Sequence, residues 1–230
     1  MSWSSKVEQA VASFDPSIAI ERASTPPASW YTDPAFAELE REAVFRRNWV
    51  CVGMLADIQE HGAYIAGELL GISWLVVRGD DGALRGFHNV CRHHAAQLVD
   101  GQGCLKRFQC PYHGWTYGLD GALLFAPHIA GIENFDRADH GLVPLPVTTW
   151  GPLVFAWLGD GPPRVEPAVE FAALGVTLDD LDWSGLVRHE QRVYEVGCDW
   201  KVFCDNYLDG GYHIETAHPG LYEALDPTAY

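Results

Sequence analysis

The chain has 230 residues and is 48% hydrophobic and 20% charged, which argues against a chain that is disordered throughout. Its 31 Asp and Glu outnumber its 15 Lys and Arg, and the formal net charge of −16 argues against nucleic acid or an anionic membrane as a partner. The longest apolar stretch is too short to span a bilayer, and the N-terminus has no secretory signal. We therefore expect a cytoplasmic protein whose six Cys are reduced thiols or metal ligands.

The first predicted element is a helix that follows a loosely organised N-terminal segment. Asp33 can serve as the N-cap, and Pro34 suits the first helical position because its missing N–H would have no partner there. Phe36 and Leu39 then recur on one helical face. We therefore expect a helix over residues 35–49.

After this helix the pattern changes to short strands separated by glycine-rich turns, and a group of prolines near residue 165 marks a boundary. Such a pattern is typical of a small, turn-rich β domain followed by a second region. The elements that we expect are, in chain order, hairpins over 72–90 and 115–125, a strand over 153–158, a strand over 186–196 and an interrupted helix over 199–218.

Two short motifs each place one Cys and one His in a predicted loop. Cys91 and His93 form a C-x-H motif, and after sixteen intervening residues Cys110 and His113 form a C-x-x-H motif. Two thiolates and two imidazoles can bind either zinc or an iron–sulfur cluster. Zinc fingers usually pair Cys with Cys and His with His along the chain, whereas a [2Fe–2S] centre can take one of each from each loop. The order therefore favours the cluster, with zinc as the alternative.

At these motifs the chain resembles the Rieske family. The likeness extends through Asn89-Val90-Cys91 and through Cys110-Pro111-Tyr112-His113-Gly114-Trp115. Respiratory Rieske proteins carry an additional Cys where Tyr112 stands here, so the resemblance is to the oxygenase and ferredoxin branch. It implies a [2Fe–2S] cluster whose ligands are Cys91, His93, Cys110 and His113. Oxygenases commonly have Arg-Gly after the first ligand pair, and His94-Ala95 departs from that pattern.

A second group of candidate ligands lies in the acidic segment 199–218. His213, His218 and a carboxylate can form the facial triad that holds non-haem Fe(II). The two His are five residues apart, about 140° around an ideal helix, so they can bind one ion only if the helix ends or widens between them. Asp209 lies four residues before His213, on the same face. Taken alone, the segment is equally consistent with a solvated acidic helix.

This segment resembles the mononuclear iron site of Rieske non-haem iron oxygenase α subunits, and residues 206–213 are particularly similar to choline monooxygenases. The resemblance implies that His213 and His218 are iron ligands. The family also uses an acidic residue before the first His to bridge to a cluster-binding His of the neighbouring subunit. Many members have that acid where Gly210 stands, so the role passes to the nearest acid. The candidate catalytic residues are Asp209, Asp205 as its reserve, and Asn206, which completes the acidic–Asn pair of the motif.

The third iron ligand of the family comes from much further along the chain, and this sequence ends at Tyr230. The resemblance therefore implies an α subunit that is truncated at its C-terminus. It also implies an α+β fold, in which a small antiparallel β Rieske domain precedes the start of an α+β helix-grip (START-like) catalytic domain. The expected domains are an N-terminal arm and helix at 1–44, the Rieske domain at 45–160 and the incomplete catalytic domain at 161–230.

The resemblance implies an oxidoreductase. A ferredoxin or flavin reductase would reduce the cluster, and the electron would pass to the mononuclear Fe(II) for O₂-dependent hydroxylation of a small organic substrate. In the family the two centres face each other across subunits, commonly in a homotrimer. The likeness to choline monooxygenases suggests a quaternary amine, whose cation would favour an aromatic cage. Alternatives are an aromatic-ring-hydroxylating dioxygenase or O-demethylase, a Rieske electron carrier, and a zinc-stabilised binding module.

The remaining Cys and His residues lie outside both motifs. We expect buried free thiols at Cys51, Cys104, Cys198 and Cys204. We expect surface positions for His61, His128, His140 and His189. His88 and His94 flank the first ligand loop and could hydrogen-bond near cluster sulfur or remain ordinary polar loop residues. Trp115 and Tyr112 are expected to shield the cluster.

Overall fold

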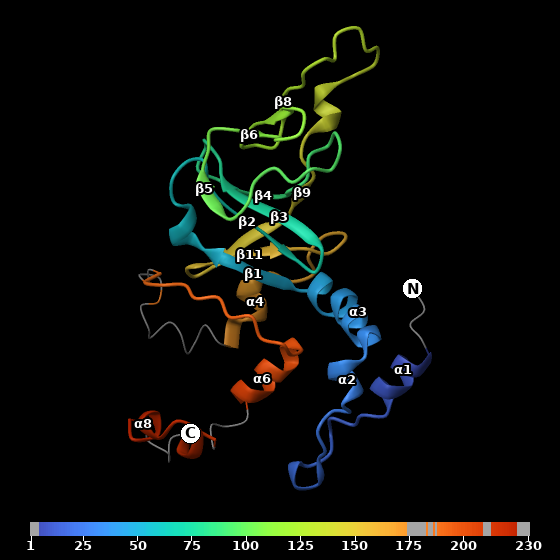
Figure 1. Cartoon of the computed structure of the whole chain (residues 1–230), viewed down its shortest axis with the longest axis vertical. Helices are drawn as coiled ribbons and strands as arrows, with labels where there is room; N and C mark the ends of the chain where they lie inside the picture. Colours follow the sequence, from blue (N-terminus) through green and yellow to red (C-terminus); the bar gives the residue numbers. More distant parts are fainter. Residues whose placement is uncertain (1–4, 174–182, 184–185, 187, 209–212, 225–230) are drawn as a thin grey trace. The chain divides into compact units, whose positions relative to one another are not determined.

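Short antiparallel strands make up the middle of the chain, and short helices make up both of its ends (Figure 1). The computed structural model describes residues 5–173, 183, 186, 188–208 and 213–224. The chain forms two compact units. Unit 1 combines Met1–Glu40 with Arg192–Tyr230, and unit 2 consists of Arg41–Gln191.

Unit 2 contains three antiparallel sheets among its described residues. Their strand orders are β5-β2-β3-β4-β9, β1-β11-β10 and β6-β7-β8. The strands are β1 Trp49–Met54, β2 Ala63–Leu69, β3 Ile72–Arg78, β4 Leu84–His88, β5 Gln102–Cys104, β6 Phe108–Gln109, β7 Thr116–Tyr117, β8 Leu123–Phe125, β9 Pro144–Leu145, β10 Val147–Trp150 and β11 Leu153–Trp157. The antiparallel pairing and both predicted hairpins are confirmed, because β3 pairs with β4 and β7 pairs with β8.

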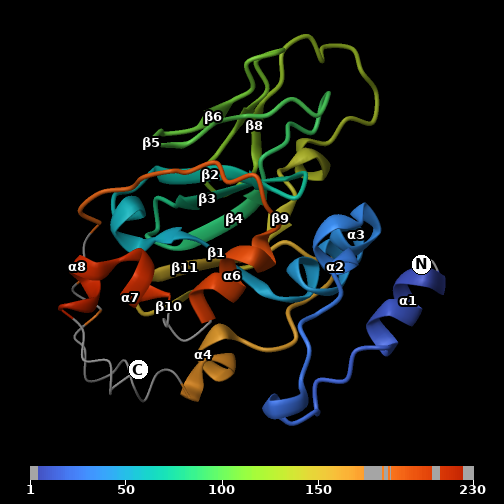
Figure 2. The same ribbon diagram turned by 60° about the horizontal axis from the view of Figure 1, so that its bottom comes forward.

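The central strand β3 is buried on both faces. Leu75 and Val77 pack in one core with residues of the β6-β7-β8 sheet, whereas Val76 packs in a second core with Val154 of β11. Figure 2 shows the sheets as layers, with β6 and β8 above β2–β4 and with β1 and β11 below them. Because each face of β3 meets another sheet, the residues of its buried stretch Trp74–Val77 are all apolar. The upper layer carries the second of the two Cys-His loops, between β6 and β7.

The predicted helix cap is confirmed, but the helix is shorter than expected. Asp33 Oδ1 accepts a hydrogen bond from Ala35 N–H at 3.0 Å, and α3 spans Pro34–Ala43. Beyond it, Val44 has a φ of −108°, and a 3-10 turn follows over Phe45–Arg47. The Val44 carbonyl accepts from Arg47 N–H at 3.2 Å and from Asn48 Nδ2 at 2.7 Å. The predicted α-helix is therefore wrong over 44–49, because the chain tightens into a 3-10 turn and then becomes extended at Asn48, before β1 begins at Trp49.

The strand predicted over 186–196 is also wrong, since none of the described residues of that range is in a strand. Three of its apolar side chains are highly exposed: Val193 (81%), Tyr194 (74%) and Val196 (64%). A strand needs a neighbouring strand to accept its hydrogen bonds, and β-branched composition alone does not supply one.

Unit 1 consists of short helices from both ends of the chain. They include α1 Ser5–Ala12, α2 Ser29–Thr32, most of α3, α6 Trp200–Leu208, α7 Ile214–Ala217 and α8 Pro219–Tyr222. The interrupted helix predicted over 199–218 is confirmed as α6 and α7. None of the helices in the described part of the chain combines the length and the apolar character that crossing a membrane would require.

Candidate metal centres

Two backbone hydrogen bonds to Cys91 hold the first Cys-His loop together. Cys91 N–H donates to the Ala96 carbonyl at 2.8 Å, and Ala95 N–H donates to the Cys91 carbonyl at 3.0 Å. Ala95 lies in the left-handed region with φ 58°, which is unfavourable for a residue with a Cβ atom. This is the position at which the related oxygenases commonly have glycine. The His94-Ala95 pair, which departs from the Arg-Gly pattern, therefore keeps the hydrogen bonds of the turn, but Ala95 adopts a strained backbone conformation.

The second loop repeats the same hydrogen bonds. Cys110 N–H donates to the Trp115 carbonyl at 2.7 Å, and Gly114 N–H donates to the Cys110 carbonyl at 3.0 Å. Gly114 has φ 73° and occupies the place that Ala95 holds in the first loop. Glycine meets this requirement without strain. The two loops are thus equivalent in backbone structure although their Cys–His spacings differ by one residue.

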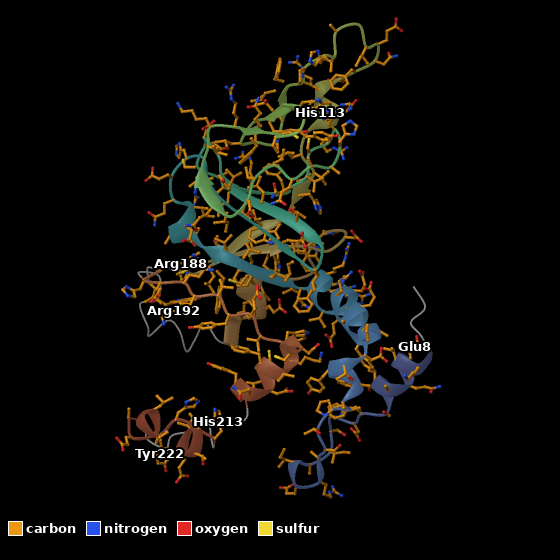
Figure 3. The ribbon with its side chains drawn as sticks, in the orientation of Figure 1. Glu8, His113, Arg188, Arg192, His213 and Tyr222 are labelled. Atoms are coloured by element: carbon orange, nitrogen blue, oxygen red, sulfur yellow. The ribbon has the colours of Figure 1, made fainter. Side chains whose placement is uncertain are left out.

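The four predicted cluster ligands fall into a buried pair and an exposed pair. Cys91 and Cys110 are 2% and 3% exposed, whereas the His93 and His113 side chains reach the surface. The two imidazole ring centroids are 4.8 Å apart. His113 lies in the region of the β6-β7-β8 sheet (Figure 3). The structure therefore brings the two loops together, with the thiols on the inside and the imidazoles on the outside.

This donor set fits a [2Fe–2S] cluster with two Cys on one iron and two His on the other. A single tetrahedral zinc would need all four donor atoms around one point. Among the described residues, however, the set of side chains whose ligand atoms lie close enough together to hold one ion is His93, His94 and His113. This set includes neither of the two thiols. The separation of thiols from imidazoles suits a two-metal centre better than zinc.

Tyr117, which the sequence analysis did not single out, contacts the first ligand loop. Its hydroxyl lies 3.3 Å from Cys91 Sγ and accepts a hydrogen bond from Arg92 N–H at 3.0 Å. Either atom can donate in this contact while Cys91 carries a proton, whereas a cluster-bound thiolate would leave the Tyr117 hydroxyl as the donor. Burial and the contact with Cys91 raise the pKa of Tyr117, so the hydroxyl stays protonated. The sequence signal that could have found it was its place in a predicted strand, two residues after Trp115.

Two further residues support these loops. Asn89 is completely buried; its side chain accepts from the N–H groups of Leu98 and Val99 and donates to the Val99 carbonyl. Trp115 is buried and stacks on the His93 ring with centroids 4.8 Å apart and an angle of 2° between the planes. Trp115 therefore shields His93 as expected, and the Tyr112 ring, although 66% exposed, packs against the His113 ring with centroids 3.9 Å apart.

A pocket of about 780 Å³ opens beside the two exposed imidazoles. Apolar side chains line it next to His93 and His113, among them Ile129, Ile132 and Phe135. The imidazole edge of the site is therefore accessible from outside unit 2 and is bordered by a partly apolar surface.

The second predicted site contains two neighbouring imidazoles in unit 1. The rings of His213 and His218 have centroids 5.9 Å apart and lie nearly perpendicular to each other. The single turn α7 lies between them, and His218 follows its end with φ −135°. The helix therefore does end between the two His, as their spacing requires. Figure 3 shows His213 on this helical segment, near Tyr222 of α8.

The acidic candidates differ in where they lie. Asp209 is outside the described residues. Asp205 and Asn206 are exposed on α6, and Asp205 Oδ2 accepts a hydrogen bond from the Tyr31 hydroxyl at 2.7 Å. In the described part of the chain, neither residue joins His213 and His218 in a group that could hold one metal ion.

The expectations for the other Cys and His were partly wrong. Cys51, Cys104 and Cys198 are exposed and Cys204 is half-buried, although all four are free thiols. His61, His128 and His189 are on the surface as expected, whereas His140 is half-buried and stacks on Phe135. His94 contacts the His93 ring at a centroid distance of 4.0 Å, whereas His88 lines a different pocket. Single-residue tendencies do not specify which side of a short strand or loop faces the core.

Two family models match the regions of the chain that contain these two groups of candidate ligands. The model of the Rieske [2Fe-2S] domain matches residues 48–136, and the model of the ring hydroxylating alpha subunit catalytic domain matches residues 183–229. The chain thus joins a Rieske [2Fe–2S] domain to a segment of an α-subunit catalytic domain, the arrangement of Rieske oxygenases. Together the two domains imply a [2Fe–2S] cluster and a mononuclear non-haem iron.

Within this class the chain is homologous to the choline and carnitine monooxygenases. It is 43% identical to the chloroplastic choline monooxygenase of Arabidopsis thaliana, covering 98% of this chain and 56% of the relative. It is 38% identical to the oxygenase subunit of glycine betaine monooxygenase from Chromohalobacter salexigens, covering 86% of this chain and 44% of the relative. The chain spans about half the length of the curated relatives it matches.

Solved structures give the same result. The quaternary ammonium Rieske monooxygenase CntA in complex with L-carnitine superimposes with a TM-score of 0.77 at 31% identity, covering 86% of this chain and 56% of that structure. Naphthalene 1,2-dioxygenase from Rhodococcus sp. superimposes with a TM-score of 0.74 at 28% identity, covering 89% and 48%. The predicted α+β class and the antiparallel Rieske domain are confirmed.

Proposed function

We propose that this chain carries the electron-entry centre and the two-histidine half of the oxygen-activating centre of a monooxygenase that hydroxylates a quaternary amine. The observation that carries the proposal is that one chain contains two groups of candidate metal ligands. The first is a pair of Cys-His loops with buried thiols and exposed imidazoles, and the second is a pair of imidazoles at the two ends of a short helix. Hydroxylation with O₂ inserts one oxygen atom and reduces the other to water, and it consumes two electrons and two protons.

The proposed cluster ligands are Cys91, His93, Cys110 and His113. When bound, the cluster supplies one electron at a time, and neutral imidazoles in place of two thiolates make it easier to reduce. The exposed imidazole edge gives an electron a short route to or from another protein, whereas the Trp115 ring keeps water from one side of His93. Tyr117 donates its hydroxyl proton toward Cys91 Sγ.

For the second centre we propose His213 and His218 as iron ligands, with further ligands supplied from elsewhere. When bound, the Fe(II) supplies the site at which O₂ is activated. We propose Asp209 as the acid that bridges to a cluster-binding His of a neighbouring subunit, with Asp205 as its reserve and Asn206 beside it. The division of the chain at 1–44, 45–160 and 161–230 is part of the same proposal.

The proposed substrate class follows the relatives, whose names specify choline, carnitine and glycine betaine. These molecules share a quaternary ammonium group. The alternative is an aromatic-ring-hydroxylating dioxygenase or O-demethylase, which the likeness to naphthalene 1,2-dioxygenase supports. A bare Rieske electron carrier fits less well, because the match to the catalytic domain continues to residue 229.

Rieske oxygenases need a reductase or ferredoxin and O₂, and they act on small substrates. In a related quaternary ammonium Rieske monooxygenase that oxidises carnitine, electrons pass between subunits. We propose the same exchange here within a homotrimer, so that the cluster of one subunit serves the iron of the next. The apolar-bordered pocket beside His93 and His113 is a suitable surface for such a contact. We propose a cytoplasmic location, although the plant relatives are named as chloroplastic.

The test is spectroscopy on protein that is expressed from its complete reading frame and purified without air. We expect an EPR signal from the reduced cluster and a second signal when nitric oxide binds a mononuclear Fe(II). His213→Ala should abolish the second signal and leave the first, and His93→Ala should abolish the first. The exposed His189→Ala is the matched control and should change neither. A colourless, zinc-containing protein would refute the proposal.

Substrate class is tested with the same protein and a reductase. Choline, carnitine and glycine betaine should be oxidised, with one ¹⁸O from ¹⁸O₂ in the hydroxylated product. Exclusive turnover of aromatic substrates would favour the alternative. Reduction of the cluster without any nitric oxide-binding Fe(II) would favour the electron carrier.

A further inference from the structure

Helix α6 presents its charged side chains to the N-terminal part of unit 1. Lys201 and Asp205 are four residues apart and therefore lie on the same face. Both contact residues of the 29–40 segment, as described below. By contrast, the apolar Phe203 and Leu208 are 66% and 76% exposed. Polar contacts rather than a hydrophobic stripe therefore attach α6 to this segment.

The first attachment is centred on Lys201. Its ammonium lies 2.6 Å from Glu40 Oε1 and 2.6 Å from Asp199 Oδ1, and the three charged side chains are only 12–16% exposed. Trp200 Nε1 donates to Glu40 Oε2 at 2.9 Å. Burial disfavours the ammonium, but the hydrogen bonds to Asp199 and Glu40 outweigh it and raise the pKa of Lys201. Because the pair is shielded from water, it holds more firmly than an exposed ion pair.

Lys201 also occupies the aromatic cage of this region. Its ammonium lies 5.3 Å from the centroid of the Tyr31 ring and 5.4 Å from that of the Trp200 ring. Such a cage suits a quaternary ammonium group, but here a side chain of the protein already fills it. The cage therefore serves the attachment of α6 and not the substrate.

The second attachment joins Tyr31 to Asp205, which are 174 residues apart in the chain. The Tyr31 hydroxyl donates to Asp205 Oδ2 at 2.7 Å. This hydrogen bond, together with burial, raises the pKa of Tyr31 to about 12, so the hydroxyl remains a donor at physiological pH. A charged acceptor makes the bond stronger than one between neutral groups.

From these contacts we propose that Tyr31 is a positioning residue for the mononuclear iron site. Its hydroxyl holds Asp205, and through it the end of α6, in the orientation from which the chain continues to His213. Asp205 acts in this role as a hydrogen-bond acceptor and not as an iron ligand or an electron bridge. This inference rests on the proposed function of His213 and His218, and it replaces the reserve role of Asp205 with a different one.

Three substitutions distinguish the two roles of Asp205. Tyr31→Phe removes only the hydroxyl and keeps the ring over Lys201. Asp205→Asn removes the charge but keeps an oxygen that can accept from Tyr31, and Asp205→Ala removes the acceptor. The measurement is the Fe(II) affinity of the mononuclear site, followed through the EPR signal of its nitric oxide adduct, in protein from the complete reading frame.

We expect Tyr31→Phe and Asp205→Ala each to weaken Fe(II) binding by about threefold to tenfold, the size of one lost hydrogen bond. The double variant should be no weaker than either single one, because both remove the same interaction. Asp205→Asn keeps a weaker, neutral acceptor and should lose less Fe(II) affinity than Asp205→Ala. The cluster signal should be unchanged in all of them, which separates positioning of the iron from general damage.

Tyr207→Phe is the matched control, since Tyr207 is on the same helix and is 80% exposed. It should bind Fe(II) like the wild type. The proposal is overturned if Asp205→Asn loses as much affinity as Asp205→Ala while Tyr31→Phe is unaffected, or if the effects of Tyr31→Phe and Asp205→Ala add. A wild-type protein without a nitric oxide signal would instead refute the proposed iron site itself.

Discussion

Removal of the Tyr117 hydroxyl is expected to lower the reduction potential of the cluster. Tyr117 is completely buried, and its hydroxyl oxygen lies 3.3 Å from Cys91 Sγ, which as a cluster-bound thiolate would accept the hydroxyl proton. Reduction adds negative charge to the cluster, so a hydrogen bond to its sulfur is stronger in the reduced state. Tyr117→Phe keeps the ring in the core and deletes only this donor.

The magnitude follows from the difference in hydrogen-bond strength between the two redox states. A hydrogen bond to a charged group contributes about 1.5–3 kcal/mol, and a change of about 1–2 kcal/mol on adding one electron is reasonable. At about 59 mV per tenfold change for one electron, this corresponds to a fall of roughly 40–90 mV. Loss of the oxygen also leaves Arg92 N–H without its acceptor, which adds a stability cost of about 1–3 kcal/mol.

The assay is a potentiometric titration of the purified protein, read by the EPR signal of the reduced cluster, with a parallel thermal melt. Tyr112→Phe is the control, because Tyr112 lies in the second ligand loop but is 66% exposed. Its potential should stay close to that of the wild type. A potential that is unchanged or raised in Tyr117→Phe would refute the assignment of the hydroxyl as a donor to sulfur.

Three further predictions concern stability. Ala95→Gly should raise the free energy of unfolding by about 1 kcal/mol, since it removes the Cβ atom from a residue in the left-handed region. The control Ala96→Gly should lower the free energy of unfolding, and calorimetry of both variants measures the sign of each change. Arg188→Leu should destabilise unit 2 by about 1–3 kcal/mol, because the Asp57 carboxylate is only 12% exposed and loses the guanidinium 2.5 Å away. A double-mutant cycle with Asp57→Ala should show coupling between the two residues, and strictly additive changes in unfolding free energy would contradict the ion pair. Asn89→Ala should cost about 3 kcal/mol and reduce cluster content, measured as iron and sulfide per chain, because it removes the three hydrogen bonds of a completely buried side chain.

Much of the candidate site was predictable because metal-ligand chemistry is a property of residue type and spacing. The two Cys-His motifs are short, and their order along the chain already separates a cluster from a zinc finger. The break between His213 and His218 was predictable for a similar reason, since helix geometry does not allow residues five apart to bind one ion. The β3–β4 hairpin was predictable because its turn and its β-branched residues are adjacent in sequence.

The failures occurred where a structure depends on distant partners. The helix predicted to Trp49 ends at Ala43, because the chain then forms a 3-10 turn and enters β1, which pairs with the distant strand β11. The apolar segment over 186–196 has strand composition, but composition does not provide a neighbouring strand to pair with. The thiols expected in the core are mostly exposed, because burial depends on how strands and loops pack.

By itself, the sequence determined which residues are candidate ligands of the two metal centres, because residue type and spacing are local to the chain. Only the tertiary structure decided which of those atoms are buried, that Ala95 must adopt a glycine-like conformation, and that Tyr117 reaches Cys91 across 26 residues. It also decided that Asp205, an expected catalytic acid, accepts a hydrogen bond from Tyr31 across 174 residues. These contacts join residues that no sequence motif relates, because folding brings them together through packing and hydrogen bonding over the whole chain.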